Sequence, residues 1–217
     1  MSARLQIALL GSLVVRHGDQ AVPTTRWHSR HIPRLLGILI SARGNRVPNE
    51  QLIAWLWPER TGEVAAVTLR SAISSLRQTL DNSNSGRASS RYILTKSGGY
   101  AWNSASDAWI DFEQFLALTD SHSNAPQTTP LRIARLERAL ALYQGDYLAD
   151  EPDESPWVQP LRQMLRERYL NALTELAELQ STAGMHDAAI ELARRGLATE
   201  PLREPLYRVL MRAQARS

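Results

Sequence analysis

The segment 67–84 carries large aliphatic residues at intervals of three and four positions, at Leu69, Ile73, Leu76 and Leu80. This spacing places them along one side of an α-helix, and the Asp-Asn-Ser-Asn sequence that follows is typical of a helix end. The opposite side carries arginine and short polar side chains: Thr68, Arg70, Ser71, Ser74, Ser75, Arg77 and Gln78. The pattern predicts a helix packed on a core, with an outer face that is either simply solvated or in contact with a polar, anionic partner.

Short strands and helices precede this helix in the first half of the chain. The runs "LQIALL" and "SLVVRHGDQAV" predict strands that are separated by Gly11-Ser12 and end in a turn at His17–Gln20. Ser29 is expected to cap a helix with Pro33 in its first turn. Asn49 is expected to cap a second, shorter helix that stops before a proline.

A predicted hairpin follows the central helix. The sequence "RYILTKSGGYAWN" contains two β-rich runs on either side of Lys96-Ser97-Gly98-Gly99. Strands, three helices and a terminal hairpin, in this order, predict a winged helix-turn-helix with an additional N-terminal sheet.

The second half of the chain is predicted to be almost entirely helical. A polar linker, "SHSNAPQTTP", and an acidic loop, "DYLADEPDESPW", separate its helical stretches. A long helix over about 158–183 ends at Ala183-Gly184, and the next helix begins with Ala188-Ala189 and stops at Pro201. This order of helices, small residues and breaks is similar to that of tetratricopeptide helix pairs, which bury their apolar faces by stacking on one another.

Charge divides the chain into two halves of opposite sign. Residues 1–103 hold 13 Lys+Arg against 5 Asp+Glu, a net charge of +8, whereas residues 104–217 hold 12 against 17, a net charge of −5. A basic surface attracts polyanions and an acidic one repels them. If the partner is nucleic acid, the first half is therefore expected to bind it.

Composition excludes several classes of protein and site. The chain has 43% hydrophobic and 22% charged residues, which is typical of a globular fold, and no cysteine, which excludes disulfides, thiolate zinc sites and cysteine nucleophiles. No apolar run approaches the roughly 18–20 residues of a membrane span, and the N-terminus is a poor signal peptide. These features predict a cytoplasmic protein without membrane contact.

Residues 5–103 resemble the DNA-binding domain of OmpR-type regulators, and more closely that of the Streptomyces antibiotic regulatory protein family. The matching pieces are "LLGSLVVRHGDQAV", "NEQLIAWLWPE", "LRSAISSLRQTL" and "ILTKSGGYAW". The resemblance implies that 49–57 is the positioning helix, 64–80 the recognition helix and 91–102 the wing. Ser74-Ser75 stand where the OmpR-type pattern often has two arginines, so the contacts of those arginines do not transfer.

The second half resembles the bacterial transcriptional activation domain of the same family. The similar features are an Asp-x-x-x-Phe helix start at Asp111 and Phe115 and a Leu-Ala-Asp…Trp loop from Leu148 to Trp157. Further helices would follow Arg216 in that family, so the chain resembles the front of a longer regulator or a trimmed version of one. The resemblance also implies head-to-tail binding to direct repeats in promoter DNA and recruitment of RNA polymerase.

The predicted fold is an α+β, OmpR-like winged helix with an N-terminal β-sheet over residues 1–103, followed by an all-α, tetratricopeptide-like domain over 104–217. The predicted function is a sequence-specific activator of transcription that binds direct repeats in double-stranded promoter DNA and recruits RNA polymerase. It is expected to form a homodimer, at least on DNA. The alternative is a helical-repeat scaffold whose winged helix binds no DNA.

The candidate DNA-binding residues lie on the central helix, before it and on the hairpin: Arg60, Thr68, Arg70, Ser71, Ser74, Ser75, Arg77, Gln78, Arg91 and Lys96. Arg70 is long enough for a bidentate contact to guanine, although a phosphate contact is the alternative. Arg77 is expected to contact phosphate or to form a structural ion pair. Lys96, at the hairpin tip, is expected to contact the phosphate backbone.

Other side-chain groups predict structure rather than chemistry. The acidic residues 150–154 lack the spacing of a calcium loop and are expected to form a solvated loop between domains. His28 and His31 lack the further ligands of a metal site. The tryptophans of the basic half are expected to pack in the core. With no nucleotide-binding loop or readable catalytic set, the sequence predicts neither an enzyme nor a cofactor or metal.

Overall fold

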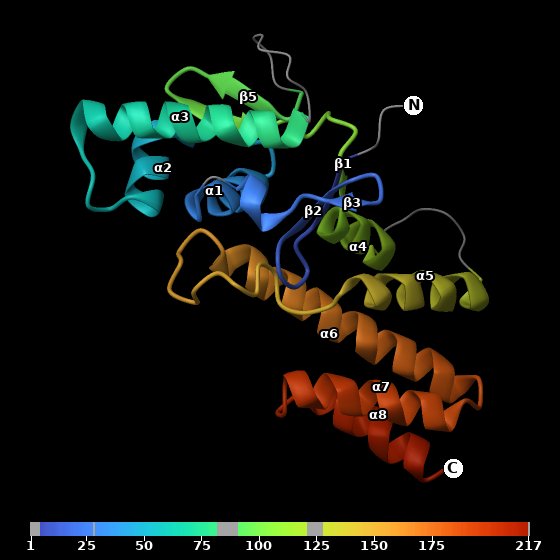
Figure 1. Cartoon of the computed structure of the whole chain (residues 1–217). Helices are drawn as coiled ribbons and strands as arrows, with labels where there is room; N and C mark the ends of the chain where they lie inside the picture. Colours follow the sequence, from blue (N-terminus) through green and yellow to red (C-terminus); the bar gives the residue numbers. More distant parts are fainter. Residues whose placement is uncertain (1–4, 28, 82–90, 121–127, 217) are drawn as a thin grey trace. The chain divides into compact units, whose positions relative to one another are not determined.

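The computed structural model in Figure 1 describes residues 5–27, 29–81, 91–120 and 128–216. These residues form two compact units. The first unit contains the chain up to Ile110 together with Tyr147–Leu161, and the second contains Asp111–Asp146 and Arg162–Ser217. The expected connection at 82–90, most of the linker at 121–127 and His28 lie outside the described residues.

The first unit begins with a four-stranded sheet in the order β3-β2-β1-β7. Its strands are β1 (Leu5–Ala8), β2 (Val14–His17), β3 (Gln20–Ala21) and β7 (Trp109–Ile110). β1 pairs antiparallel with β2 and buries alternate side chains, as expected for a strand with one face on a core. The predicted N-terminal sheet is confirmed, but β7, which pairs parallel with β1, was not foreseen because two residues carry no periodic signal.

Three helices of this unit pack against one another: α1 (His31–Ser41), α2 (Asn49–Leu56) and α3 (Gly62–Asp81). A short 3-10 helix, η1 (Thr24–Arg26), precedes them. Residues 35–40 of α1 are all buried, which makes α1 the central helix of the unit. α3 contains the expected recognition helix, 64–80.

Both predicted helix caps are displaced by one residue. The N-cap positions fall on Arg30 and Pro48 instead of Ser29 and Asn49. The Ser29 hydroxyl still accepts a hydrogen bond from the backbone N–H of His31, at 3.2 Å. The backbone N–H of Asn49 donates instead to the carbonyl of Gly98, at 3.0 Å, so the start of α2 is bonded to the hairpin.

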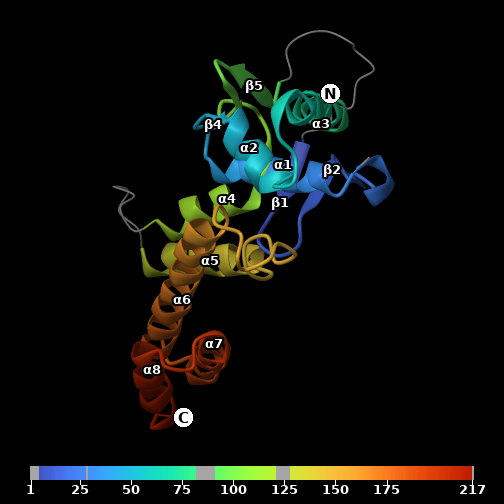
Figure 2. The same cartoon turned by 90° about the vertical axis from the view of Figure 1, so that its left-hand side faces the viewer.

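The wing is a three-stranded sheet in the order β4-β6-β5, and Figure 2 shows it beside α2 and α3. Its strands are β4 (Val47–Pro48), β5 (Ile93–Lys96) and β6 (Gly99–Trp102). Lys96 pairs with Gly99, so Ser97 and Gly98 form a two-residue hairpin turn, with Gly98 at φ +69°. A Cβ on Gly99 would lie 2.2 Å from the carbonyl oxygen of Val47, so only glycine lets β4 join the hairpin.

The tryptophans of the basic half are partly or fully buried, in line with the expected core packing. Trp57 and Trp102 are 9% and 2% exposed, whereas Trp27 and Trp55 are half-buried. Trp102 stacks on Tyr92, with ring centroids 5.9 Å apart, and both side chains are buried.

The acidic loop belongs to the first unit. The backbone N–H groups of Leu148 and Ala149 donate to the carbonyls of Leu9 and Gly11, at 2.8 and 2.9 Å. Glu151 pairs with Arg34 at 2.9 Å and accepts a hydrogen bond from the Ser155 hydroxyl at 2.5 Å. The expectation of a solvated loop is therefore wrong for this carboxylate.

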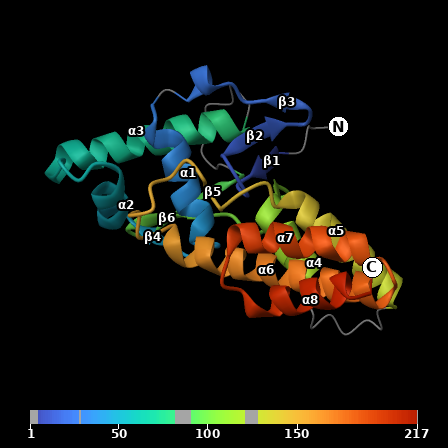
Figure 3. The same cartoon turned by 90° about the horizontal axis from the view of Figure 1, so that it is seen from below.

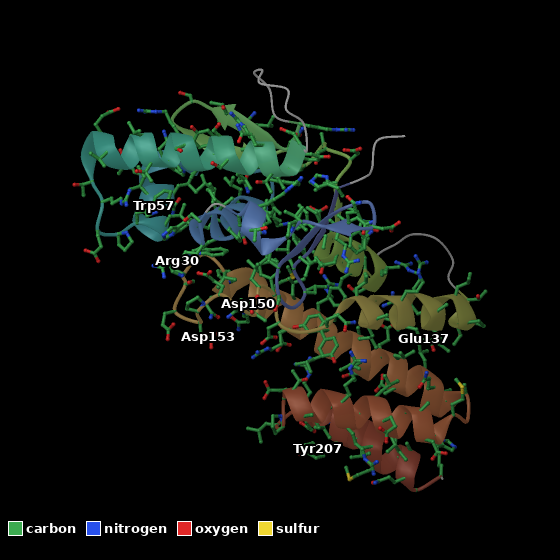
Figure 4. The ribbon with its side chains drawn as sticks, viewed as in Figure 1. Arg30, Trp57, Glu137, Asp150, Asp153 and Tyr207 are labelled. Carbon is green, nitrogen blue, oxygen red and sulfur yellow. The ribbon has the colours of Figure 1, made fainter. Side chains whose placement is uncertain are left out.

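Exposed carboxylates remain on the same loop. Asp150, Asp153 and Glu154 are exposed. In Figure 4, Asp150 and Asp153 lie along this loop, on the side of the unit that carries Arg30. Among the described residues, no group of three or more His, Asp or Glu side chains is arranged to hold a metal ion.

The second unit consists of helices and is tetratricopeptide-like, as predicted. It contains α4 (Asp111–Thr119), α5 (Thr129–Leu142), most of α6 (Gln159–Thr182), α7 (His186–Thr199) and α8 (Glu204–Gln214). Figure 3 shows α6, α7 and α8 lying alongside one another. A Cβ on Gly196 would lie 2.4 Å from Leu206 Cδ1, so glycine permits the close approach of α7 and α8.

A small-residue core joins these last helices. Ala189 is fully buried in a cluster with Ala177, Val209 and Ala213. Small side chains at such positions let helix backbones approach closely, and they leave no space for a larger residue. Ala189, one of the two small residues at the start of this helix, therefore lies at a helix contact.

We expect Ala189→Arg to unfold the helices of the second unit. The substitution overpacks the cluster and buries a charge without a partner, which together cost more than about 3 kcal/mol. The matched control is Ala188→Arg, one position earlier on the exposed side of α7, which should change the free energy of unfolding by less than about 0.5 kcal/mol. Urea denaturation followed by circular dichroism measures both. Superimposable unfolding curves for the two variants would contradict this packing.

Candidate nucleic-acid interface

The rotation of α3 is fixed by its buried side. Leu69, Ile73, Leu76 and Leu80 are at most 2% exposed, so the predicted stripe is confirmed. The opposite side presents exposed side chains at every turn: Val64, Val67, Arg70, Ser71, Ser74 and Gln78. The outward face of α3 therefore mixes short polar groups with two valines that the sequence reasoning did not include.

Arg70 lies on this outward side and is paired within the helix. Its guanidinium contacts the Glu63 carboxylate at 2.8 Å, and the two side chains are 57% and 79% exposed. Ion pairs this exposed contribute little to stability, because water screens the charges and both side chains lose entropy. Arg70 can therefore leave Glu63 for another acceptor at little cost.

Arg77 connects α3 to the wing. Its Nη2 donates to the carbonyl of Ile93 at 2.9 Å and to the hydroxyl of Thr95 at 2.8 Å, and its guanidinium lies 5.9 Å from the ring centre of Tyr100. These contacts give Arg77 a structural role, as in the second of its two expected roles. Its partners are neutral oxygens, however, and not the carboxylate of the expected ion pair.

Arg60 and Thr68 are bonded to each other at the start of α3. Arg60 Nη1 donates to Thr68 Oγ1 at 3.0 Å, and this hydroxyl donates in turn to the carbonyl of Val64 at 2.8 Å. The hydroxyl proton is thus used within the protein, and Thr68 offers a partner one acceptor position and its methyl group. Ser75 is half-buried on the same flank of the helix.

Two cations lie at the tip of the wing. Lys96 is exposed at the end of β5 and forms no ion pair with the residues that the structure describes. Arg46, which precedes β4, donates to the carbonyl of Ser97 at 2.9 Å and so lies against the hairpin turn. Arg91, at the base of the wing, is instead paired with Asp107 at 2.7 Å. Sequence reasoning missed Arg46 because the strand β4 that brings it to the wing is only two residues long.

A groove of about 560 Å³ runs along one flank of α3. Ser29, His31, Trp57, Arg60, Thr68, Ser71 and Ser75 line it together with three apolar residues. Trp57, at the end of α2, is labelled in Figure 4, and its ring centre lies 5.3 Å from that of His31. Partial burial lowers the pKa of His31, and the charges of Arg30, Arg34 and Arg60 lower it further.

This flank of α3 is therefore electropositive. Arg30 and His31 were not among the predicted site residues, because a helix start carries no signal that it will lie beside a helix 40 positions later in the chain. Arg30 and Arg60 on this flank, together with Lys96 and Arg46 on the wing, place positive charge on both sides of the outward face of α3. The major groove of B-DNA admits one α-helix, and phosphates border it on both sides.

We expect Arg77→Ala to loosen the wing without unfolding the unit. The change removes both hydrogen bonds that hold β5 to α3, at a cost of about 1–3 kcal/mol. Hydrogen exchange of the β5 and β6 amides should accelerate by tenfold or more. The control is Gln78→Ala, whose side chain is exposed on the neighbouring position and for which no hydrogen bond is seen within the described part of the chain. Equal exchange rates in the two variants would show that Arg77 does not hold the wing.

Two family models match the chain in succession. Residues 29–102 match the family described as "Transcriptional regulatory protein, C terminal". Residues 110–217 match the family described as "Bacterial transcriptional activator domain". The two matches follow the order that the resemblance implied.

Curated relatives align with almost the whole chain. The chain is 29% identical over 218 residues to the regulatory protein AfsR of Streptomyces coelicolor, covering 100% of this chain and 21% of that protein. It is 28% identical over 209 residues to the transcriptional regulatory protein MoaR1 of Mycobacterium tuberculosis, covering 95% of this chain and 65% of that protein. The chain thus spans less than two thirds of the length of either relative.

A solved structure shares the fold. It is that of Mycobacterium tuberculosis EmbR in complex with a low affinity phosphopeptide, with a TM-score of 0.81 and 25% identity, covering 99% of this chain and 55% of that one. Within the described residues, none of the helices has both the length and the apolar character that a membrane crossing requires. The order of the two matched domains and the similarity to AfsR show that the chain belongs to the Streptomyces antibiotic regulatory protein family, with an OmpR-like winged helix followed by a bacterial transcriptional activation domain.

Proposed function

We propose that the chain is a sequence-specific, double-stranded-DNA-binding regulator of transcription, acting in the cytoplasm as a binding protein rather than an enzyme. The observation that carries the proposal is the outward face of α3, exposed along its length and bordered by cations on both flanks. DNA binding is assigned to residues 1–103, where the net charge is +8. Such a charge attracts DNA before any base is contacted.

In this proposal α3 enters the major groove and the wing contacts the backbone beside it. Arg70, once released from Glu63, can reach the O6 and N7 of a guanine. Ser71 and Ser74 reach bases only where the backbone comes close, and they discriminate weakly because hydroxyls both donate and accept. Lys96 at the wing tip, with Arg46 beside it, contacts phosphate. Arg91, at the base of the wing, is a further candidate for a phosphate contact, because its exposed ion pair with Asp107 is weak, like that of Arg70 with Glu63.

Activation is assigned to residues 104–217. The matched family is described as a bacterial transcriptional activator domain, which supports a role in recruiting RNA polymerase. Head-to-tail binding to direct repeats would place protomers about 10–10.5 bp apart, on one side of the duplex. The relatives AfsR and MoaR1 are themselves named as regulatory proteins, which supports the same assignment.

Selection of duplex DNA by the whole chain tests the proposal. The complete chain is used because residues 147–161 are part of the first compact unit and a fragment ending at residue 103 would lack them. The chain is incubated with a pool of randomised duplexes at low salt, and retained sequences are amplified and sequenced over several rounds. Enrichment of a repeated motif, followed by footprinting, would establish the function. Absence of retention at low salt would support the scaffold alternative instead.

We expect Lys96→Ala to weaken binding to every sequence to a similar extent. A phosphate contact carries no base information, so the preferred motif should remain, and the slope of log K against log [salt] should fall by about 1. The control is Arg194→Ala, which removes one positive charge from an exposed site on α7. A changed motif with an unchanged slope would instead make Lys96 a base reader.

We expect Arg70→Ala to relax the preference at one G·C pair in each repeat. Loss of a bidentate contact to guanine removes about 1–3 kcal/mol of discrimination against the wrong base. Arg77→Ala provides the comparison, because its guanidinium is held by the wing; it should lower affinity without changing the motif. Binding selection on a randomised operator with both variants measures the difference. An unchanged motif for Arg70→Ala would assign base reading to other residues of α3.

A further inference from the structure

Two valines are exposed on the first turns of α3. Val64 is 70% exposed and Val67 is 52% exposed, although both side chains are as apolar as those in the core. Val67 and Leu76 are nine positions apart, about two and a half helical turns, so they point in opposite directions. Because Leu76 is fully buried, Val67 lies at the centre of the outward face.

The neighbouring side chain extends this apolar surface. The hydroxyl proton of Thr68 is donated to the carbonyl of Val64 and its oxygen accepts from Arg60, so Thr68 has no proton left to donate to a partner, whereas its methyl group is not engaged by these bonds. Val64, Val67 and Thr68 thus form a cluster of methyl groups on the N-terminal turns of α3. Grouped on the outward face of a helix, these side chains offer an apolar partner a larger surface than a single exposed residue does.

Charge around the methyl cluster indicates what its partner is. Arg60 and Arg70 lie on either side of it, one bonded to Thr68 and the other on the next turn. A duplex presents phosphates on both sides of its major groove, which two guanidiniums that flank an apolar centre can contact. The apolar group in that groove is the C5-methyl of thymine, and the N-terminal residues of a recognition helix are those that reach base edges.

We propose that Val67, flanked by Val64 and the methyl group of Thr68, reads a thymine methyl group in the operator. The proposal rests on the DNA-binding function proposed above and adds a specificity-determining residue to it. Discrimination at this position is hydrophobic: the valine excludes water from the methyl of thymine, and a base without that methyl leaves the contact incomplete. A·T preference at one position of each repeat follows from an apolar side chain, whereas G·C preference follows from Arg70.

Uracil substitution in the operator tests this contact directly. Each thymine of the selected operator is replaced singly by deoxyuridine, which removes only the C5-methyl and leaves base pairing intact. With the wild-type chain, one substitution per repeat should weaken binding by about fourfold, the equivalent of one buried methyl group. Val67→Ala should bind the unmodified operator more weakly by a similar factor and should no longer respond to uracil at that thymine.

The controls separate this contact from general effects. Val14→Ala truncates another exposed valine, on β2, and should keep both the affinity and the response to uracil. Val67→Ala lies at an exposed helical position and favours the helix, so its unfolding curve should match the wild type.

An operator without thymine in the repeats, or a response to uracil that persists in Val67→Ala, would overturn the inference while leaving DNA binding in place. Failure of the chain to bind any duplex would overturn the proposed function and this inference together. Wild-type uracil responses in Val67→Ala, combined with lost recruitment of RNA polymerase, would assign the valines to a protein contact and also overturn it.

Discussion

Burial of one side of α3 is the constraint from which the candidate interface follows. Leu69, Ile73, Leu76 and Leu80 are removed from water, and each buried aliphatic side chain of this size stabilises the fold by about 1.5–3 kcal/mol. Rotating the helix by even one position would expose several of them. The same burial therefore determines which side chains face outward, so the residues available to a partner are selected by core packing rather than by their own interactions.

The wing depends on the same helix. Arg77 lies beside the buried stripe and donates both hydrogen bonds that join α3 to β5, so the position of the hairpin is tied to the rotation of the helix. From the other edge, β4 joins the hairpin because Gly99 lets the carbonyl of Val47 approach, and this places Arg46 at the turn. Arg77, a candidate DNA ligand in the sequence, thus bonds the strand that ends at Lys96 to the recognition helix.

Periodic patterns in the sequence predicted the helices and the longer strands of the fold. They could not predict pairing between residues that are far apart in the chain. The stripe on α3, the hairpin turn at Ser97-Gly98 and the helix contact at Ala189 each carry a local signal, and all three are present. β4 and β7 consist of two residues each and exist only because distant strands pair with them. The acidic loop was predicted to be solvated from its composition alone, and no local pattern indicates that Glu151 finds Arg34 117 positions earlier in the chain.

The same limit applies to the candidate site. Selecting residues by charge and hydrogen-bonding capacity gave Arg60, Arg70, Arg77, Arg91 and Lys96 as candidates, but no sequence signal shows that Arg77 is bonded to the wing or that Arg91 is paired with Asp107. It passed over Val64 and Val67, because an apolar residue in a sequence is assigned to the core by default. Only the rotation of α3 shows that these two valines face outward.

Polar and apolar parts of such a face act over different distances. The charge of a cation is felt across about 8–10 Å of salt solution, so the arginines and Lys96 bring a duplex to the helix whatever its sequence. A methyl contact acts only when two surfaces touch, within about 4–4.5 Å, and it contributes nothing to a duplex of the wrong sequence. Raising the salt concentration removes the first effect and leaves the second. The cations of the first unit therefore account for affinity and its salt dependence, and the short side chains at the centre of α3, apolar ones included, account for the choice of sequence.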